Sequence, residues 1–231
     1  MGNIKMPLKS GKTAMPRKVS SPFRFLPLYN FLSALSWGFI LYNVVSIFPK
    51  VGQPQFYSDT KQFVTYIQCG AVIEILNSAL GIVRSPLLTT CAQVASRLLV
   101  VLGIFQCVPD TEAAKTILYV TLLTAWSITE VVRYLFYFCT LCFKNGPPVP
   151  LTFLRYNLFL VLYPLGVASE LLIIHSALPL AESTYGAPYK WALIAGMLAY
   201  VPGFPVLFGH MLAQRKKVMK SLSNAGYDKT K

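Results

Sequence analysis

Long apolar stretches alternate with short polar stretches along most of this chain. Many apolar stretches run for about twenty residues or more, the length of helix that crosses the apolar core of a bilayer. A helix is the form in which one such segment satisfies all of its backbone hydrogen bonds within lipid. The pattern predicts an all-α, polytopic membrane protein, a bundle of six transmembrane helices at 24–48, 62–83, 87–108, 116–143, 151–180 and 190–213.

Polar, basic segments flank this apolar region and predict the organisation of the chain. We expect a disordered basic tail at 1–23, a six-span membrane domain at 24–213 and a basic tail at 214–231. An even number of spans places both ends of the chain on one side of the membrane. Because Lys and Arg concentrate on the cytosolic side, we expect both termini in the cytosol.

Composition supports a membrane protein and argues against one competing class. Hydrophobic residues make up 55% of the 231 residues and charged residues only 13%, whereas soluble domains carry about 25% charged residues. A net charge of +13 is typical of some nucleic-acid-binding proteins, but here the basic residues gather at the two ends of the chain. That distribution favours contact with anionic lipid, and we expect no nucleic-acid partner.

The stretch 151–180 carries the most candidate chemistry. It is apolar enough to cross a bilayer, yet it contains Tyr163 and Glu170 and is interrupted by Pro164 and Gly166. An ionisable carboxyl group inside a membrane span costs about 2.5 kcal/mol or more, so by default it marks function. Glu170 follows Tyr163 by seven residues, which is about 20° short of two helical turns, so we expect both side chains on one face. Pro164 removes a backbone amide, and Gly166 leaves a gap in which a helix or a ligand can approach.

Several motifs, in order along the chain, resemble those of the very-long-chain 3-hydroxyacyl-CoA dehydratases, a family first described as protein-tyrosine-phosphatase-like. The motifs are Ser85-Pro86, Gln93-x-x-x-Arg97, Trp126-Ser127-Ile128-x-Glu130-x-x-Arg133-Tyr134, Arg155-Tyr156, Leu162-Tyr163-Pro164-x-Gly166-x-x-x-Glu170-Leu171 and Ala177-Leu178-Pro179. The resemblance implies a six-span enzyme of the endoplasmic reticulum membrane that dehydrates 3-hydroxyacyl-CoA during fatty-acid elongation. It also implies other elongation enzymes as partners, and it places the catalytic residues at Tyr163 and Glu170.

This dehydration needs two proton movements, one off C2 and one onto the departing C3 hydroxyl group. Our hypothesis is that Glu170 is the base and Tyr163 the acid, although the reverse assignment is equally compatible with the sequence. Burial disfavours the charged form of a carboxyl group, which suits a group that exchanges protons at working pH. The two residues are about 10.5 Å apart along an ideal helix, so their side chains must converge or Pro164 must kink the helix.

Two further acids and two arginines within the expected spans suggest ion pairs, because an unpaired charge in the bundle would be prohibitive. Glu130 and Arg133 are three residues apart and can touch on one helix surface. We expect Glu74 to meet Arg97 across the adjacent second and third spans, with Gln93 one turn from Arg97. Structural support with some substrate contact is the role that we expect for this set.

Two more residues of 151–180 are candidates for substrate contact. At Gly166 we expect room for the acyl chain, so that Gly166→Leu would fill the passage. Arg155 lies near the expected cytosolic end of the span, where a guanidinium group would bind a CoA phosphate or would anchor the helix at the interface.

Other classes of function receive less support from the sequence. We expect no cofactor and no metal, because no Walker loop or dinucleotide glycine fingerprint occurs and no acidic or second histidine partner accompanies either histidine. One alternative is a small transporter or channel, with Glu74, Glu130 and Glu170 lining an ion path. Another is a non-catalytic scaffold for elongation enzymes, although a scaffold would have no need of both Tyr163 and Glu170.

Overall fold

The computed structural model describes residues 20–21, 23–83 and 85–227, and within them the chain is helical with no strand. Most of the expected N-terminal tail and the last four residues lie outside the described residues. The α-helices are α1 (Phe25–Tyr42), α2 (Phe48–Val51), α3 (Gln55–Gly70), α4 (Val72–Ala79), α5 (Leu87–Val100), α6 (Ile117–Cys142), α7 (Val149–Asn157), α8 (Phe159–Tyr185) and α9 (Ala187–Tyr227). Wider π-helical turns extend α1 and α5 as η1 (Asn43–Ile47) and η2 (Val101–Gln106), and a 3-10 turn, η3 (Glu112–Lys115), precedes α6.

Four helical segments of the described chain are long and apolar enough to cross a membrane. They are Phe25–Val51, Leu87–Gln106, Phe159–Tyr185 and Ala187–Leu222. The other two expected spans differ from these four. The segment expected at 62–83 is divided between α3 and α4 at Ala71, and α6 is 26 residues long but carries Glu130 and Arg133 near its centre. The first of these is therefore divided into two helices of 16 and 8 residues, and the charged residues of the second lower its apolar character.

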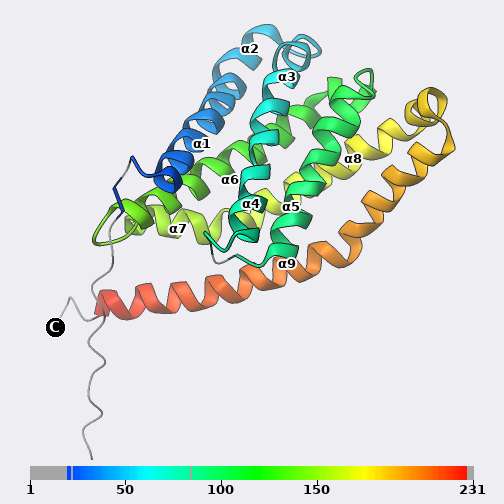
Figure 1. Ribbon diagram of the computed structural model, residues 1–231. Helices are drawn as coiled ribbons and strands as arrows, with labels where there is room; N and C mark the ends of the chain where they lie inside the picture. Colours follow the sequence, from blue (N-terminus) through cyan, green and yellow to red (C-terminus); the bar gives the residue numbers. More distant parts are fainter. Residues whose placement is uncertain (1–19, 22, 84, 228–231) are drawn as a thin grey trace, which may run out of the picture.

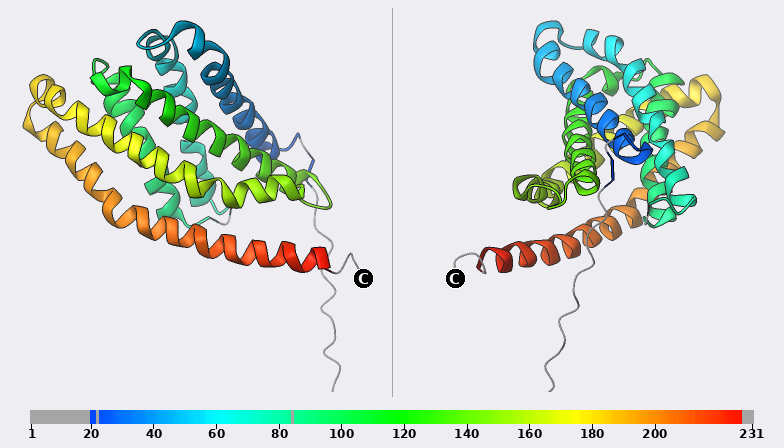
Figure 2. Two further views of the ribbon diagram at one scale, coloured as in Figure 1. Left: turned by 180° about the vertical axis from the view of Figure 1, so that it is seen from behind. Right: turned by 60° about the vertical axis from the view of Figure 1, so that its left-hand side comes forward.

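The helices form a bundle in which α6 is central. Helix α1 packs along one side of α6, α8 packs along another, and α9 runs along α8 (Figure 1; Figure 2). The start of α1 and the end of α9 lie at the same end of the bundle (Figure 1). The helical hairpin of α8 and α9 turns at Gly186, whose φ of 83° is a backbone conformation that favours glycine.

Irregular positions divide the segments on which the candidate residues lie. The expected span 151–180 is two helices, because a turn at Leu158 separates α7 from α8. Pro164 lies within α8, and Pro202 and Pro205 lie within α9. Helix α9 does not end near residue 213 but continues to Tyr227, so the basic segment after the last apolar residues is helical as far as the structure describes it.

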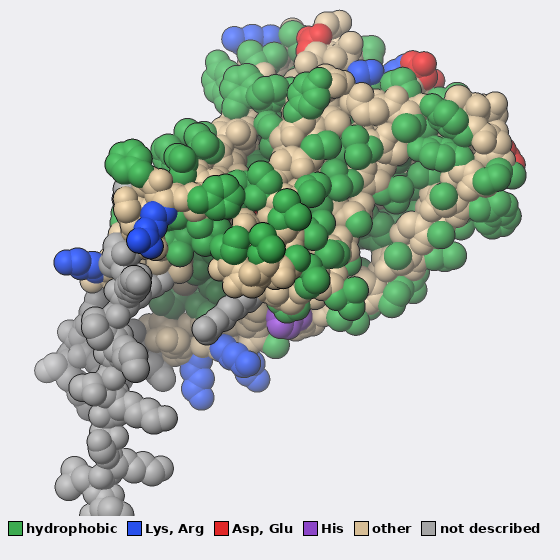
Figure 3. Space-filling model, viewed as in Figure 1, with side chains coloured by type: hydrophobic (Ala, Val, Ile, Leu, Met, Phe, Trp, Pro, Cys, Tyr) green, Lys and Arg blue, Asp and Glu red, His purple; other side chains and the backbone are tan. Residues whose placement is uncertain are grey.

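The surface has the distribution of side chains that lipid contact requires. Hydrophobic side chains cover most of the face in Figure 3, and the charged side chains visible there gather toward two opposite ends of the molecule. Large apolar side chains such as Leu88, Val161 and Val201 are more than two thirds exposed, at 84%, 69% and 71%. Exposure of this extent over a continuous face is typical of a surface that meets lipid or a partner.

The interior packs around aromatic side chains of α1, α3, η2 and α6. Tyr119 of α6 contacts Tyr57, Phe105 and Phe56 edge-on, with ring centroids 5.0 to 6.0 Å apart. Nearer the middle of α6, the rings of Trp126 and Trp37 of α1 meet edge-on at 6.3 Å. These contacts hold α6 in place, and α6 in turn carries residues of both polar clusters described below.

Candidate active site

Glu170 lies inside the bundle on α8, where its residue surface is only 6% exposed. The indole Nε1 of Trp126, on α6, donates a hydrogen bond of 2.8 Å to carboxylate oxygen Oε1. The hydroxyl group of Tyr200, on α9, donates to the other oxygen, Oε2. No salt bridge of the described residues includes Glu170. Its carboxyl group is therefore held by two neutral donors, one on each carboxylate oxygen.

Tyr163 faces the same neighbouring helix as Glu170 but has different contacts. Its ring stacks parallel to that of Phe204 on α9, with centroids 5.0 Å apart and an interplanar angle of 0°, and Phe208 lies next to it at 6.2 Å. Because Glu170 also contacts α9, the prediction that both side chains project from one face of α8 is confirmed. The two groups are close enough to interact electrostatically, but no hydrogen bond joins them in the described structure.

Gly166 lies between these two residues and faces α6. A Cβ atom added at Gly166 would stand 3.6 Å from Cβ of Ala125 on α6. Helix α6 therefore approaches α8 at this glycine, as one of the two expected alternatives has it, and room for an acyl chain beside Gly166 stays a prediction. A small residue here allows α8 and α6 to pack closely, and Trp126 of α6 reaches Glu170.

A second polar cluster joins α4, α5 and α6. Arg133 forms a bidentate pair with Glu74, through hydrogen bonds of 2.7 and 2.6 Å, and its Nε donates to Glu130 at 2.7 Å. Arg97 donates to the other oxygen of Glu130, and Tyr134 donates to Glu74. The expected Glu130–Arg133 pair is confirmed.

The expected pairing of Glu74 with Arg97 is wrong, because Glu74 binds Arg133 and Arg97 binds Glu130. The adjacent Glu130 and Arg133 of α6 present both charges between α4 and α5, and each takes its partner from a different helix. Gln93 is exposed, and it joins Arg97 through its backbone carbonyl, which accepts from the arginine Nε at 3.3 Å. We refer to Glu74, Arg97, Glu130 and Arg133 as the ionic cluster.

The ionic cluster and Glu170 are neighbours. Glu130 is one helical turn from Trp126 on α6, and Arg97 lies near enough to Glu170 for the two charges to attract. Ser96, next to Arg97 on α5, lies near the Tyr200 hydroxyl group, and its own hydroxyl group donates to the Gln93 carbonyl at 3.1 Å. Helices α5, α6, α8 and α9 thus all contribute to the surroundings of one carboxyl group.

Arg155 is separate from both clusters and lies on α7. Its Nη2 donates to the Tyr137 hydroxyl group at 3.3 Å, and the guanidinium group lies over the rings of Tyr137 and Tyr156, at 5.6 and 6.0 Å. No carboxylate of the described residues forms a salt bridge with it, and its buried Nε has no hydrogen-bond partner. The arrangement leaves donor capacity on a fixed guanidinium group.

The sequence did not predict a role for two residues of the Glu170 site. Trp126 appeared only as part of a motif, and Tyr200 was not singled out at all. The available signal for Tyr200 was a hydroxyl group in an apolar span two residues before Pro202. That signal does not indicate a partner, because the contact with Glu170 depends on how α9 packs on α8.

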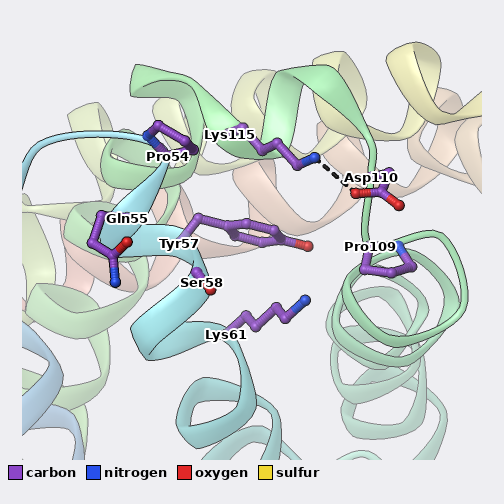
Figure 4. Close-up of a pocket in the computed structure, with 8 residues that line it drawn as sticks. All are labelled: Pro54, Gln55, Tyr57, Ser58, Lys61, Pro109, Asp110 and Lys115. Atoms are coloured by element: carbon purple, nitrogen blue, oxygen red, sulfur yellow. Dashed lines mark hydrogen bonds and ion pairs between the residues drawn. The ribbon is translucent and has the colours of Figure 1, made fainter.

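A surface cavity of about 340 Å³ lies beside the start of α3 (Figure 4). It is lined by Pro54, Gln55, Tyr57, Ser58, Lys61, Pro109, Asp110 and Lys115. Lys115 bonds Asp110 at 2.8 Å and holds the pKa of that exposed carboxyl group below its usual value. Neither Tyr163 nor Glu170 lines this cavity, so it is distinct from the candidate active site.

Comparison with known proteins agrees with the motifs in the chain. The family model described as protein tyrosine phosphatase-like protein, PTPLA, matches residues 68–221. A rice protein named very-long-chain (3R)-3-hydroxyacyl-CoA dehydratase PASTICCINO 2B is 37% identical over 207 residues, which cover 84% of this chain and 92% of the rice protein. The Caenorhabditis elegans dehydratase hpo-8 is 36% identical, covering 84% and 94% of the two chains, and human very-long-chain (3R)-3-hydroxyacyl-CoA dehydratase 2 is 33% identical, covering 84% and 80%.

Together, the helical bundle with apolar, membrane-length helices and the buried polar site define an integral membrane protein with an internal carboxyl group. The chain belongs to the protein tyrosine phosphatase-like (PTPLA) family, whose curated members matched here are named very-long-chain (3R)-3-hydroxyacyl-CoA dehydratases. No solved structure matches the chain.

Proposed function

We propose that this protein is a hydro-lyase that converts long-chain or very-long-chain 3-hydroxyacyl-CoA to trans-2-enoyl-CoA and water in fatty-acid elongation. The names of its relatives support the reaction class. The structural observation that carries the proposal is the buried Glu170 carboxyl group, held by Trp126 and Tyr200 with no arginine paired to it. A carboxyl group with neutral partners can lose and regain a proton without breaking a salt bridge, which general acid–base catalysis requires.

In the proposed mechanism, Glu170 removes the proton from C2 of the thioester. The electron pair of that C–H bond forms the C2–C3 double bond, and the C3–O bond breaks. Tyr163 donates its proton to the departing hydroxyl group, which leaves as water, and the proton on Glu170 then returns to the phenolate oxygen directly or through water. The reverse assignment, with the phenolate as base and the carboxylic acid as donor, gives the same products and the same balance.

Both groups face α9, so we propose that the reacting carbons lie along the contact between α8 and α9. Tyr163 is held through its ring by Phe204, an apolar contact that leaves its hydroxyl group without a partner among the described residues. Such a group can turn toward a substrate hydroxyl group at the cost of stacking alone, which is about 0.5–1.5 kcal/mol for an aromatic pair. Elimination of water by these groups requires no added cofactor in the proposed mechanism.

We further propose that Arg155 contacts a phosphate group of CoA. Its unpartnered Nε and its fixed position over two tyrosine rings support this role, because a guanidinium group with free donors is suited to phosphate. In the ionic cluster, in contrast, the charges pair with one another, and we propose that this cluster supports the bundle.

For the membrane arrangement, we propose six spans with both termini in the cytosol, in the endoplasmic reticulum membrane. In this arrangement α3 and α4 together form one span and α6 another, in addition to the four apolar segments. The position of both described ends at one end of the bundle supports an even number of crossings (Figure 1). A cytosolic Arg155 would then face the compartment that holds acyl-CoA, where we propose that the other elongation enzymes meet this protein.

The test is the formation of enoyl-CoA from a long-chain 3-hydroxyacyl-CoA by the purified full-length protein in detergent. We expect Glu170→Gln and Tyr163→Phe each to lower kcat by about 10²- to 10⁴-fold, the usual contribution of a general acid or base. Matched controls lie on the same helix: Glu182, an exposed partner of Lys190, and Tyr185, whose hydroxyl group bonds the Cys107 carbonyl. Glu182→Gln and Tyr185→Phe should retain wild-type turnover.

Three outcomes separate the possible functions. Turnover by wild type and both controls, with loss in both site variants, supports the lyase and its residues. Turnover that survives Glu170→Gln and Tyr163→Phe would keep the enzyme and remove this site. A folded wild-type protein that forms no enoyl-CoA would contradict the lyase and favour transport, which requires a sealed membrane, or a scaffold.

A further inference from the structure

Helix α9 contacts both proposed catalytic residues. Tyr200 donates a hydrogen bond to Glu170, and Phe204, one helical turn later, stacks on Tyr163. Residues four apart lie on one face of a helix, so a single face of α9 determines the surroundings of both groups. The same face continues to Phe208, which also lies against Tyr163.

The Glu170 carboxyl group is oriented by donors on opposite sides. Trp126 approaches Oε1 from α6 and Tyr200 approaches Oε2 from α9. An ionised carboxylate oxygen can accept more than one hydrogen bond, so one donor on each oxygen fixes the plane of the group while leaving lone pairs for a proton from substrate. Trp126 alone would leave the carboxyl group free to rotate about its last torsion.

We infer that Tyr200 is a positioning residue for Glu170, which holds the carboxyl group in the orientation that proton transfer needs. This inference rests on the proposed function. The connected set Tyr200, Glu170 and Trp126 joins α9, α8 and α6 around one proton-transfer group.

The direct test is infrared spectroscopy of the full-length protein, which does not depend on turnover. The carboxyl band of Glu170 is first assigned as the band that Glu170→Gln removes. We expect Tyr200→Phe to shift this band, because one carboxylate oxygen loses its donor. The matched control is Tyr189→Phe, which removes a hydroxyl group from the same helix, where it bonds the Gly103 carbonyl at 2.7 Å. Tyr189→Phe should leave the band in place, and a band that Tyr200→Phe also leaves in place would overturn the contact.

The second test is the division of the kinetic effect between kcat and KM. Tyr200→Phe should lower kcat by about 10- to 100-fold, the usual range for one hydrogen bond to a charged group, while KM changes by less than about twofold. A purely structural role would instead lower the fraction of active enzyme and leave the kcat of the folded fraction unchanged, which would overturn the positioning role. The infrared shift reports the Tyr200–Glu170 contact even if the wild-type protein is inactive. A result against the lyase function can therefore be distinguished from a result against this inference.

Position-specific incorporation of a fluorinated tyrosine provides a variant with nearly native shape if Tyr200→Phe does not fold. Fluorine makes the phenol more acidic and therefore alters the strength of its hydrogen bond. At position 200 this change should alter the Glu170 band and the pH profile of kcat, whereas the same residue at position 189 should alter neither. Identical spectra and pH profiles for the two positions would reject the role of Tyr200.

Discussion

Two buried carboxylates of this bundle, Glu130 and Glu170, lie on adjacent helices and have opposite kinds of partner. Glu130 is 2% exposed and lies between two arginines, whereas Glu170 is 6% exposed and receives hydrogen bonds from an indole and a phenol. Burial is therefore almost equal at the two sites. What differs is whether the negative charge is neutralised by a positive charge.

The difference assigns the two carboxylates to different tasks. Within the ionic cluster two acids and two arginines balance, so protonation of Glu130 would leave an uncompensated positive charge in the bundle. Such a change is expensive in a buried pair, and the cluster is therefore suited to holding α4, α5 and α6 together. At Glu170 both hydrogen-bond partners are neutral, so the carboxyl group can gain or lose a proton without breaking a salt bridge. Helix α6 joins the two sites, because Trp126 and Glu130 are one turn apart.

The most direct test of this difference between Glu130 and Glu170 is to make the same substitution at both sites. Glu130→Gln leaves Arg97 and Arg133 with one carboxylate between them, so we expect it to lower the free energy of unfolding by about 3–5 kcal/mol. Glu170→Gln keeps a polar group of similar shape, and we expect a loss of about 0.5–1.5 kcal/mol, the usual value of one hydrogen bond. Unfolding in detergent micelles, followed by circular dichroism, measures both.

The exposed Glu182→Gln is the reference for these two variants, because it changes the same group on α8 outside the bundle interior. Equal losses at positions 130 and 170 would show that burial alone, and not the partner, decides the cost. A large loss at position 170 with a small loss at position 130 would reverse the assignment of the two tasks.

A smaller effect is expected at the helix contact beside the catalytic pair. Gly166→Leu places a branched side chain where Cβ alone already reaches the van der Waals distance from Ala125. We expect overpacking to cost about 1–3 kcal/mol and to move α8 away from α6, which lengthens the Trp126–Glu170 hydrogen bond. Measured kcat should therefore fall in the folded protein, while the ionic cluster remains intact.

Gly166→Ala is the matched control, because its one methyl group makes an ordinary contact of 3.6 Å. We expect it to retain stability and turnover. If Gly166→Leu instead raised KM with kcat unchanged, the glycine would contribute to substrate binding, as the sequence first suggested, and not to the approach of two helices.

Local relations in the chain were predictable, and relations between distant segments were not. The Glu130–Arg133 pair and the common face of Tyr163 and Glu170 follow from helical periodicity, so the sequence was enough to predict them. The partner of Glu74 depends on which of two arginines α4 meets after folding, which no spacing rule decides. The Glu170–Tyr200 contact likewise depends on the turn at Gly186, which returns α9 along α8.

The ends of the helices show the same difference between what the sequence predicts and what depends on the folded structure. The apolar pattern located the helical segments, but it did not show the breaks at Ala71, which directly follows Gly70, and at Leu158, which has no adjacent proline or glycine. It also placed the end of the last span near residue 213, whereas α9 continues to Tyr227. The residues after 213 are polar and basic, and such residues are good helix formers once a helix has begun, so loss of apolar character marked an expected membrane boundary and not a helix end.

The smallest effect is expected for an ion pair outside the bundle interior, and it tests whether burial is needed for the stability that the ionic cluster provides. Lys115 and Asp110 form a salt bridge of 2.8 Å, somewhat longer than those of the buried pairs, and the carboxyl group is exposed. Lys115 lowers the pKa of Asp110 in the folded protein, so the contribution of the pair is present at neutral pH and disappears as pH falls below about 4, through the folded-state pKa. Asp110→Asn should leave Tm at pH 7 within error of wild type, because exposed pairs contribute little, and any small difference should decrease as pH falls below about 4. A loss at pH 7 as large as that of Glu130→Gln would show that pairing stabilises this protein equally at its surface and in its interior.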